Sequence, residues 1–247
     1  MSERLSRIES LIGTEALERL GKLRVAIFGV GGVGSVCAES LVRSGVGHLT
    51  LVDSDCVVES NINRQLPAMI PTIGRAKVDV LAEHFADINP EAEIVPVQAL
   101  YSMADRDRFN FKNFDVVVDA IDSLAHKIDL LATASEAGCQ VFCSLGAAGK
   151  LDPTQVRIAS IWETSGCPLG KLVRNGLRKR DFKGDFQAVY SLEKSMVAES
   201  GAVQSGEVVT HGNSVKAAVL GSAMPVTAAF GLALSSLVIR SVLPPEN

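Results

Sequence analysis

Gly29, Gly31 and Gly34 have the spacing G-x-G-x-x-G, between the apolar run RVAIF and a helical pattern. Such a loop points backbone N–H groups and a helix N-terminus at one spot, where the helix dipole favours an anion. Asp53 lies 19 residues after Gly34, at the end of the next apolar run, where a carboxylate can accept hydrogen bonds from a ribose. These residues, together with Gly32, predict a nucleotide-binding site.

Polar and cationic residues further along indicate which nucleotide is bound. The segment SNINRQ contains Asn61, Arg64 and Gln65, and Lys77 begins the next helical pattern. An enzyme that breaks a phosphoanhydride needs cations to offset charge on the phosphates, whereas hydride transfer does not. Asp122, at the end of the apolar run VVVDAID, is placed to hold Mg²⁺, which prefers oxygen ligands. Each residue alone fits a surface or capping role, but together they favour ATP over NAD.

The elements that position these residues alternate between strand and helix. Such alternation predicts an α/β fold with a doubly wound, Rossmann-like, mainly parallel sheet. Pro96 places its strand near a sheet edge, and Thr14 is the expected N-cap within an N-terminal helical segment. The expected strands are 24–30, 48–55, 92–100, 114–122 and 140–149, and the expected helices are 2–22, 34–45, 74–90 and 125–138.

The strand and helix pattern becomes less regular after residue 150, which predicts two functional parts. Residues 1–150 would form the ATP-binding adenylation core, and residues 151–247 a smaller C-terminal extension that faces the substrate. The extension is expected to hold strands at 151–164 and 186–199 around a basic helix, followed by a glycine-rich segment at 200–214 and a hydrophobic helix. His211, within the glycine-rich segment, is expected to be solvated.

Composition is typical of a cytoplasmic protein. The net charge of -4 excludes overall basicity, and five cysteines without a C-x-x-C pair indicate reduced thiols. The charged start MSERLSRIES has no apolar core of a secretory signal. Residues 217–239 carry no charge and are long enough to cross a bilayer, but they are rich in Ala, Gly and Ser. They form either a buried or interface helix or a membrane contact.

Residues 171–183 contain a basic stripe in the second half of the chain. Lys171, Arg174 and Arg178 have i, i+3, i+7 spacing and share a helical face, which suits either phosphate contacts of a nucleic acid or a solvated surface. Its nucleic-acid-binding candidates are Lys171, Arg174, Arg178, Lys179 and Arg180.

The motifs GVGGVG, LVDSD, SNINRQ, GRAKVDVLAEHFADINP and VVDAIDS, which lie within residues 4–149, resemble the ThiF/MoeB/HesA superfamily of ubiquitin-activating-like adenylating enzymes. The resemblance implies that a substrate carboxylate attacks the α-phosphate of ATP and forms an acyl-adenylate. It also implies a homodimer, because Arg7 matches an arginine that enters the neighbouring subunit's ATP site. By position, Asp53 would bind the ribose and Asp122 the Mg²⁺. The residues that the resemblance implies around the nucleotide phosphates are Asp55, Asn61, Arg64, Gln65 and Lys77.

The second half, with GAAGKLDPTQVRIASI, CPLGKLVRNGLRKR and AVYSLE, resembles one branch of that superfamily, the tRNA threonylcarbamoyladenosine dehydratases. The resemblance implies a tRNA substrate whose threonyl carboxylate is adenylated and then closed into a ring, with net loss of water. The alternative is an activator of a ubiquitin-like sulfur-carrier protein, and a sulfur-transfer or ubiquitin-like partner stays open. That alternative is disfavoured because both C-x-x-C pairs of a zinc site are missing. Cys167 has little to mark it as a catalytic thiol.

Overall fold

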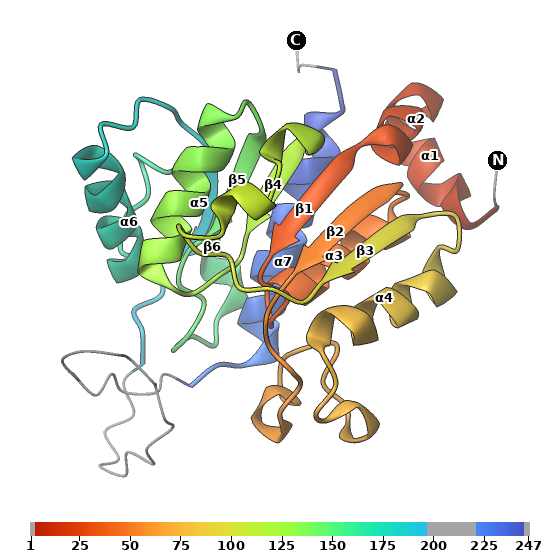
Figure 1. The fold of residues 1–247 in the computed structure, drawn as a ribbon, viewed down its shortest axis with the longest axis horizontal. Helices are drawn as coiled ribbons and strands as arrows, with labels where there is room; N and C mark the ends of the chain where they lie inside the picture. Colours follow the sequence, from red (N-terminus) through yellow and green to blue (C-terminus); the bar gives the residue numbers. More distant parts are fainter. Residues whose placement is uncertain (1–2, 197–220, 245–247) are drawn as a thin grey trace.

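The computed structural model describes residues 3–196 and 221–244, which are built around one sheet (Figure 1). Seven described strands have the order β3-β2-β1-β4-β5-β7-β6. Strand β6 is antiparallel to β7, and all other neighbours are parallel, which confirms the predicted α/β fold. The strands are β1 Arg24–Phe28, β2 His48–Val52, β3 Glu93–Val97, β4 Val116–Asp119, β5 Gln140–Ser144, β6 Val156–Ser160 and β7 Gln187–Ser191.

Burial along the strands follows their place in the sheet. The central strands β1 and β4 are almost wholly buried, as expected for parallel strands that are covered on both faces. Strand β3 forms one edge and is largely exposed. Its Pro96 donates no backbone hydrogen bond, so an edge position is tolerated. The expectation that this strand lies at an edge is confirmed.

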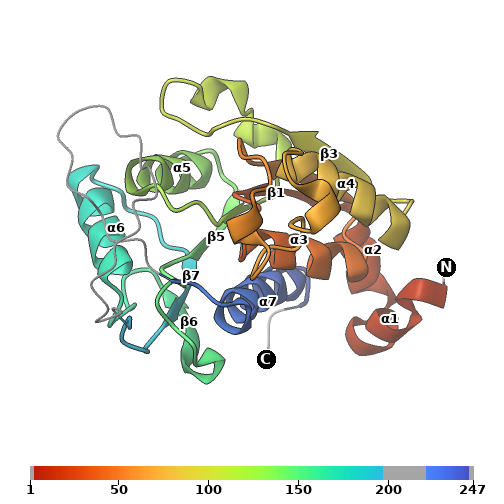
Figure 2. The same cartoon turned by 90° about the horizontal axis from the view of Figure 1, so that it is seen from below.

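Helices cover both faces, so the sheet is doubly wound. One apolar core joins α2, α3, α4 and α7 to one face, and a second joins α5, α6 and the segment 99–111 to the other. Figure 2 shows α7 alongside α3 on one side of the sheet, with α5 on the opposite side. The helices are α1 Ser6–Ile12, α2 Thr14–Lys22, α3 Gly34–Arg43, α4 Lys77–Ile88, α5 Leu124–Glu136, α6 Pro168–Lys179 and α7 Met224–Ser241.

The N-terminal helical segment is divided at Gly13. This residue has a φ of 82° and takes the N-cap position of α2. Thr14 is the first helical residue, and its Oγ1 donates to Glu9 Oε1 at 2.9 Å. The prediction of Thr14 as the N-cap was therefore wrong by one residue, because glycine adopts the left-handed turn between the two helices without strain.

The C-terminal helix α7 packs against α3. Phe230, Leu234 and Val238 are fully buried in the same core as α3, and Ser235 Oγ donates to Ser40 Oγ at 2.8 Å. Among the described helices, α7 alone is long and apolar enough to cross a membrane, and 44% of it is buried. Residues 217–220 of the predicted apolar segment lie outside the described residues.

Strands β6 and β7 extend the sheet that the first half builds, because β7 pairs directly with β5. The division at residue 150 into an adenylation core and a substrate-facing extension therefore stays a prediction about function. The glycine-rich segment 200–214, including His211, lies outside the residues that the structure describes.

Candidate active site

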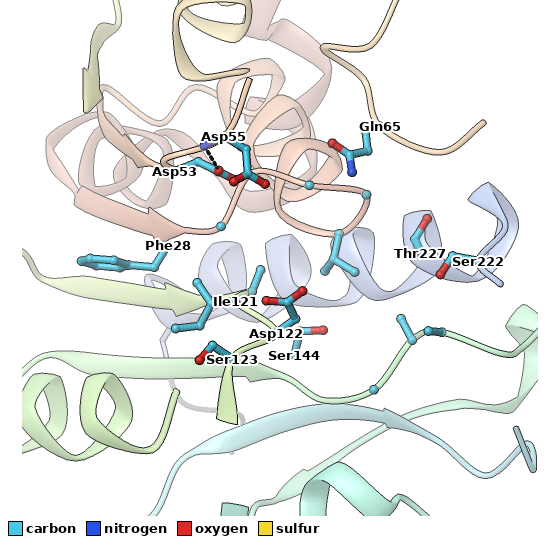
Figure 3. A pocket seen from close by; sticks show the side chains of 18 of the residues that line it. Phe28, Asp53, Asp55, Gln65, Ile121, Asp122, Ser123, Ser144, Ser222 and Thr227 are labelled. Carbon is cyan, nitrogen blue, oxygen red and sulfur yellow. Dashed lines mark hydrogen bonds between the residues drawn. The ribbon is translucent and has the colours of Figure 1, made fainter. Parts of the chain in front are cut away.

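A cavity of about 840 Å³ opens where β1, β2, β4 and β5 end. The chain leaves β1 toward β2 on one side, while β4 and β5 lie on the other, so the cavity occupies the switch point of the sheet, where α/β proteins bind ligands. In Figure 3, Asp53, Asp55 and Gln65 lie on one side of the cavity, and Asp122 and Ser144 on the other. The predicted residues that line the cavity are Gly29, Gly31, Gly32, Asp53, Asp55, Asn61, Arg64, Gln65, Lys77 and Asp122.

The glycine loop passes close to the end of β4. Gly29 has a φ of 87°, and a Cβ added there would lie 2.7 Å from the Ala120 carbonyl oxygen. A Cβ on Gly34, the first residue of α3, would lie 1.8 Å from the carbonyl oxygen of Gly29. The tight turn therefore requires glycine at both positions, and it directs the N-terminus of α3 toward the cavity. Gly34 itself supports the loop and does not line the cavity.

Two aspartates after β2 connect the loop to Lys77. The Val30 amide donates to Asp53 Oδ2 at 2.8 Å, and the Asp55 amide donates to Asp53 Oδ1 at 2.9 Å. The Lys77 ammonium donates to Asp55 Oδ2 at 2.8 Å, and the lysine side chain is 5% exposed. Asp53 thus fixes the glycine loop, and Asp55 holds the lysine against the cavity.

The SNINRQ segment places its polar side chains beside these groups. Arg64 Nη1 donates to the Ser60 carbonyl and to Asn63 Oδ1, both at 2.9 Å. Asn61 Oδ1 accepts from the Val58 amide at 3.3 Å, which stabilises the turn of the segment. The buried Oε1 of Gln65 has no partner among the described residues. An unpaired amide oxygen in a cavity wall is costly unless a ligand or water donates to it.

Asp122 follows a buried ion pair between Asp119 and Lys127, which was not predicted from the sequence. Asp119 Oδ2 accepts from the Lys127 ammonium at 2.6 Å, and neither side chain is exposed. Asp119 Oδ1 accepts from the Ile121 amide at 3.2 Å, which fixes the turn that carries Asp122. Burial raises the pKa of the Asp119 carboxyl, and the ammonium beside it opposes that shift. A lysine inside the apolar helix pattern of HKIDLL was the one sequence signal for this pair.

The donor set suits a magnesium ion that arrives with phosphates. The described residues contain no cluster of three or more His, Cys, Asp or Glu side chains that could hold a metal by themselves. Mg²⁺ at phosphate-processing sites is commonly held by one or two carboxylates together with substrate phosphates and water. The exposed carboxylate of Asp122 at the cavity wall fits that mode of binding.

The remaining predicted residues lie outside the cavity. Arg7 is exposed on α1 and does not line the cavity of its own chain. Lys171 and Lys179 are exposed on α6 and make no ion pair with a described residue. Arg178 stacks over Trp162 at 5.4 Å, and Arg180 Nη1 donates to the buried Asp129 at 2.7 Å. Arg174 donates to the Thr164 hydroxyl. Three of the five basic residues are therefore engaged within the fold.

The cysteines are free thiols. Cys56 is exposed beside the cavity, and the other four are buried. Cys167 occupies the N-cap of α6, where its Sγ accepts from the Gly170 amide at 3.5 Å. This contact gives the Cys167 side chain a structural place at the beginning of the helix.

Comparison with known proteins finds a family model and relatives that match most of the chain. The model of the ThiF family matches residues 4–246. The tRNA threonylcarbamoyladenosine dehydratase of Bacillus subtilis is 43% identical over 197 residues, which cover 80% of this chain and 78% of the relative. That of Haemophilus influenzae is 35% identical and covers 99% of this chain and 95% of the relative. The crystal structure of the Escherichia coli tRNA N6-threonylcarbamoyladenosine dehydratase in complex with ATP has a TM-score of 0.84 at 30% identity, and the match covers 97% of this chain and 93% of that one.

Proposed function

This chain belongs to the ThiF family, and from that premise we propose that it is an ATP-dependent tRNA threonylcarbamoyladenosine dehydratase. It adenylates the threonyl carboxylate of N6-threonylcarbamoyladenosine in tRNA and closes that group into a ring, with release of AMP and pyrophosphate. The observation that carries the proposal is the single cavity that joins the glycine loop to Lys77, Arg64 and Asp122. The similarity to dehydratases over nearly the whole chain supports the choice of substrate.

The first step joins the substrate carboxylate to the α-phosphate. A carboxylate oxygen forms a bond to the α-phosphorus, and the bond to the pyrophosphate oxygen breaks. Negative charge increases on the leaving pyrophosphate, and Lys77 and Arg64 are the cavity cations that stabilise it. Asp53 accepts hydrogen bonds from the ribose in this scheme while it keeps its contact to the Val30 amide.

Asp122 would hold Mg²⁺, and the ion would neutralise negative charge on the phosphates. The turn that presents Asp122 is fixed by the hydrogen bond from the Ile121 amide to Asp119. The resemblance to the adenylating enzymes implies that Arg7 of a second copy adds a further cation, and in its own chain this residue lies outside the cavity. The proposed active form is a homodimer.

The second step closes the ring without a covalent intermediate between substrate and enzyme. A ureido nitrogen of the substrate attacks the activated carbonyl carbon and loses its proton, and AMP leaves. The net change in the nucleoside is the loss of one water. No thiol is required, in keeping with the structural position of Cys167 at the start of α6.

The tRNA contacts the basic helix α6, where Lys171 and Lys179 are exposed. Phosphate contacts from lysines give sequence-independent affinity that depends on salt. The reduced cysteines suit a cytoplasmic enzyme.

The test is ATP turnover in the presence of tRNA that carries threonylcarbamoyladenosine, compared with the same tRNA without that group. We expect AMP and pyrophosphate with the modified tRNA alone. Pyrophosphate exchange that requires a ubiquitin-like protein instead would leave the adenylation chemistry and assign the enzyme to the activators of sulfur carriers.

A further inference from the structure

Lys150 is a buried lysine whose charge has no carboxylate partner among the described residues. It lines the cavity, is 5% exposed, and its ammonium donates to the Gly146 carbonyl oxygen at 2.9 Å. One carbonyl dipole does not replace the hydration of an ammonium, and an unpaired charge away from water is costly. An anionic ligand in the cavity would supply the missing partner.

The position of Lys150 separates it from the groups assigned to the triphosphate. Lys150 follows β5, whereas the glycine loop and the aspartates that hold Lys77 follow β1 and β2. In the sheet, β4 and β1 lie between β5 and β2. The cavity therefore has a second cationic region, which follows β5, whereas the residue that holds Lys77 follows β2.

This second region also meets the beginning of α6. A Cβ added to Gly146 would lie 3.6 Å from Cys167 Sγ, and Cys167 and Leu169 line the cavity. The first-turn amides of a helix have no intrahelical acceptors, and the helix dipole favours negative charge there. The ammonium of Lys150 and the N-terminus of α6 thus favour an anion in the same part of the cavity.

The same cavity contains polar atoms that lack partners. The buried Nδ1 of His126, on α5, makes no hydrogen bond to a described residue, like Oε1 of Gln65. Both residues line the cavity. A ligand with several polar groups would form hydrogen bonds to both atoms, whereas an apolar ligand would leave them unpaired.

We propose that Lys150 binds the threonyl carboxylate of the modified adenosine and holds it for attack on the α-phosphate. This assignment rests on the proposed function, which supplies a substrate with a carboxylate. One carboxylate oxygen attacks phosphorus, and the other stays on Lys150 and becomes the carbonyl oxygen of the acyl-adenylate. When the ureido nitrogen attacks that carbonyl, negative charge develops on the same oxygen, and Lys150 stabilises it.

The test compares wild type with Lys150→Met and Lys150→Gln. For each protein, dissociation constants are measured for ATP, for tRNA carrying threonylcarbamoyladenosine, and for the same tRNA without that group. We expect binding of the modified tRNA to weaken about 10- to 100-fold, the range for a lost hydrogen bond to a charged group. Binding of ATP and of unmodified tRNA should stay within about twofold, which also shows that the variants fold. Lys150→Arg should recover part of the loss, and Lys112→Met, on an exposed lysine, is the matched control.

Equal weakening for the two tRNAs, or no weakening, would overturn the assignment. Weaker binding of ATP would do so as well, because Lys150 would then belong to the triphosphate site. Failure of the proposed function can be distinguished from failure of the Lys150 assignment, because wild type itself would then form no AMP with the modified tRNA. If wild type is active and the variants bind the modified tRNA normally, the role of Lys150 alone is rejected.

Discussion

Lys127 of α5 donates to the carboxylate of Asp119 at 2.6 Å and to the carbonyl oxygen of Ser144 at 3.0 Å. One fully buried ammonium thereby links the end of β4 to the end of β5. Both strand ends continue directly into the walls of the cavity, at Ile121 and at Ser144. The geometry of the candidate active site therefore depends on an ion pair that itself lies outside the cavity.

Replacing Lys127 with Met should lower the free energy of unfolding by about 3–5 kcal/mol, because the Asp119 carboxylate is left buried and unpaired. Urea denaturation followed by circular dichroism measures this. The double variant Lys127→Met with Asp119→Leu should regain part of the loss, since apolar residues can replace a buried pair. A single variant as stable as wild type would contradict a structural role for the pair.

Gly34→Ala should abolish ATP binding, because its Cβ would lie 1.8 Å from the carbonyl oxygen of Gly29 and must displace the loop. Isothermal titration with ATP is the measurement. Gly74→Ala is the control. Gly74 has a φ of 87° but open space around the added Cβ, so backbone strain of about 1–2 kcal/mol is the expected effect and ATP binding remains. Normal ATP binding by Gly34→Ala would refute the tight loop.

Substituting Lys171 and Lys179 together with Ala should weaken tRNA binding and lower the slope of log affinity against log salt by about 1.4 to 1.8, for two lost phosphate contacts. Both side chains are exposed on α6 without an ion pair to a described residue. Arg180→Ala should act differently, by lowering stability, because Arg180 pairs with the buried Asp129. An unchanged salt slope in the double variant would remove α6 from the tRNA interface.

Acid should weaken the link between the start of β1 and the start of β4. The Arg24 guanidinium donates to the Asp115 carboxylate at 2.7 Å and lowers the pKa of that carboxyl. A depressed folded-state pKa contributes stability above the unfolded pKa, and the contribution is lost as pH falls through the folded value. Asp115→Asn should therefore melt below wild type at neutral pH, and the difference in melting temperature should shrink as the pH falls below ~4. Asp107→Asn, at an exposed aspartate, is the control. A difference in melting temperature that persists in acid would contradict this.

Much of the sheet and the phosphate-facing half of the cavity could be predicted because their signals are local. Strands buried on both faces, such as β1 and β4, are continuous apolar runs, and the glycine loop and Asp53 lie within one β-α-β unit. Lys77 was predicted for the same reason, as the beginning of a helix pattern. Its contact to Asp55 spans 22 residues and required the fold.

Contacts between distant segments could not be predicted from local patterns. Arg180 and Asp129 are 51 residues apart, so Arg180 looked like one more cation of a basic stripe. No local pattern in the sequence marks Lys150, whose buried position at the cavity depends on how the fold surrounds it. The apolar segment that overlaps α7 has the composition of either a bilayer helix or a core helix. The packing of Phe230 and Val238 beside α3 places one face of this helix in the core.

The central claim is tested most directly by mass spectrometry of nucleosides from tRNA that carries threonylcarbamoyladenosine, after incubation with the enzyme, ATP and Mg²⁺. The account predicts that the modified nucleoside loses the mass of one water with wild type and with Lys112→Ala, and keeps its mass with Lys77→Ala or without ATP. An unchanged nucleoside with wild-type enzyme and ATP would contradict the account.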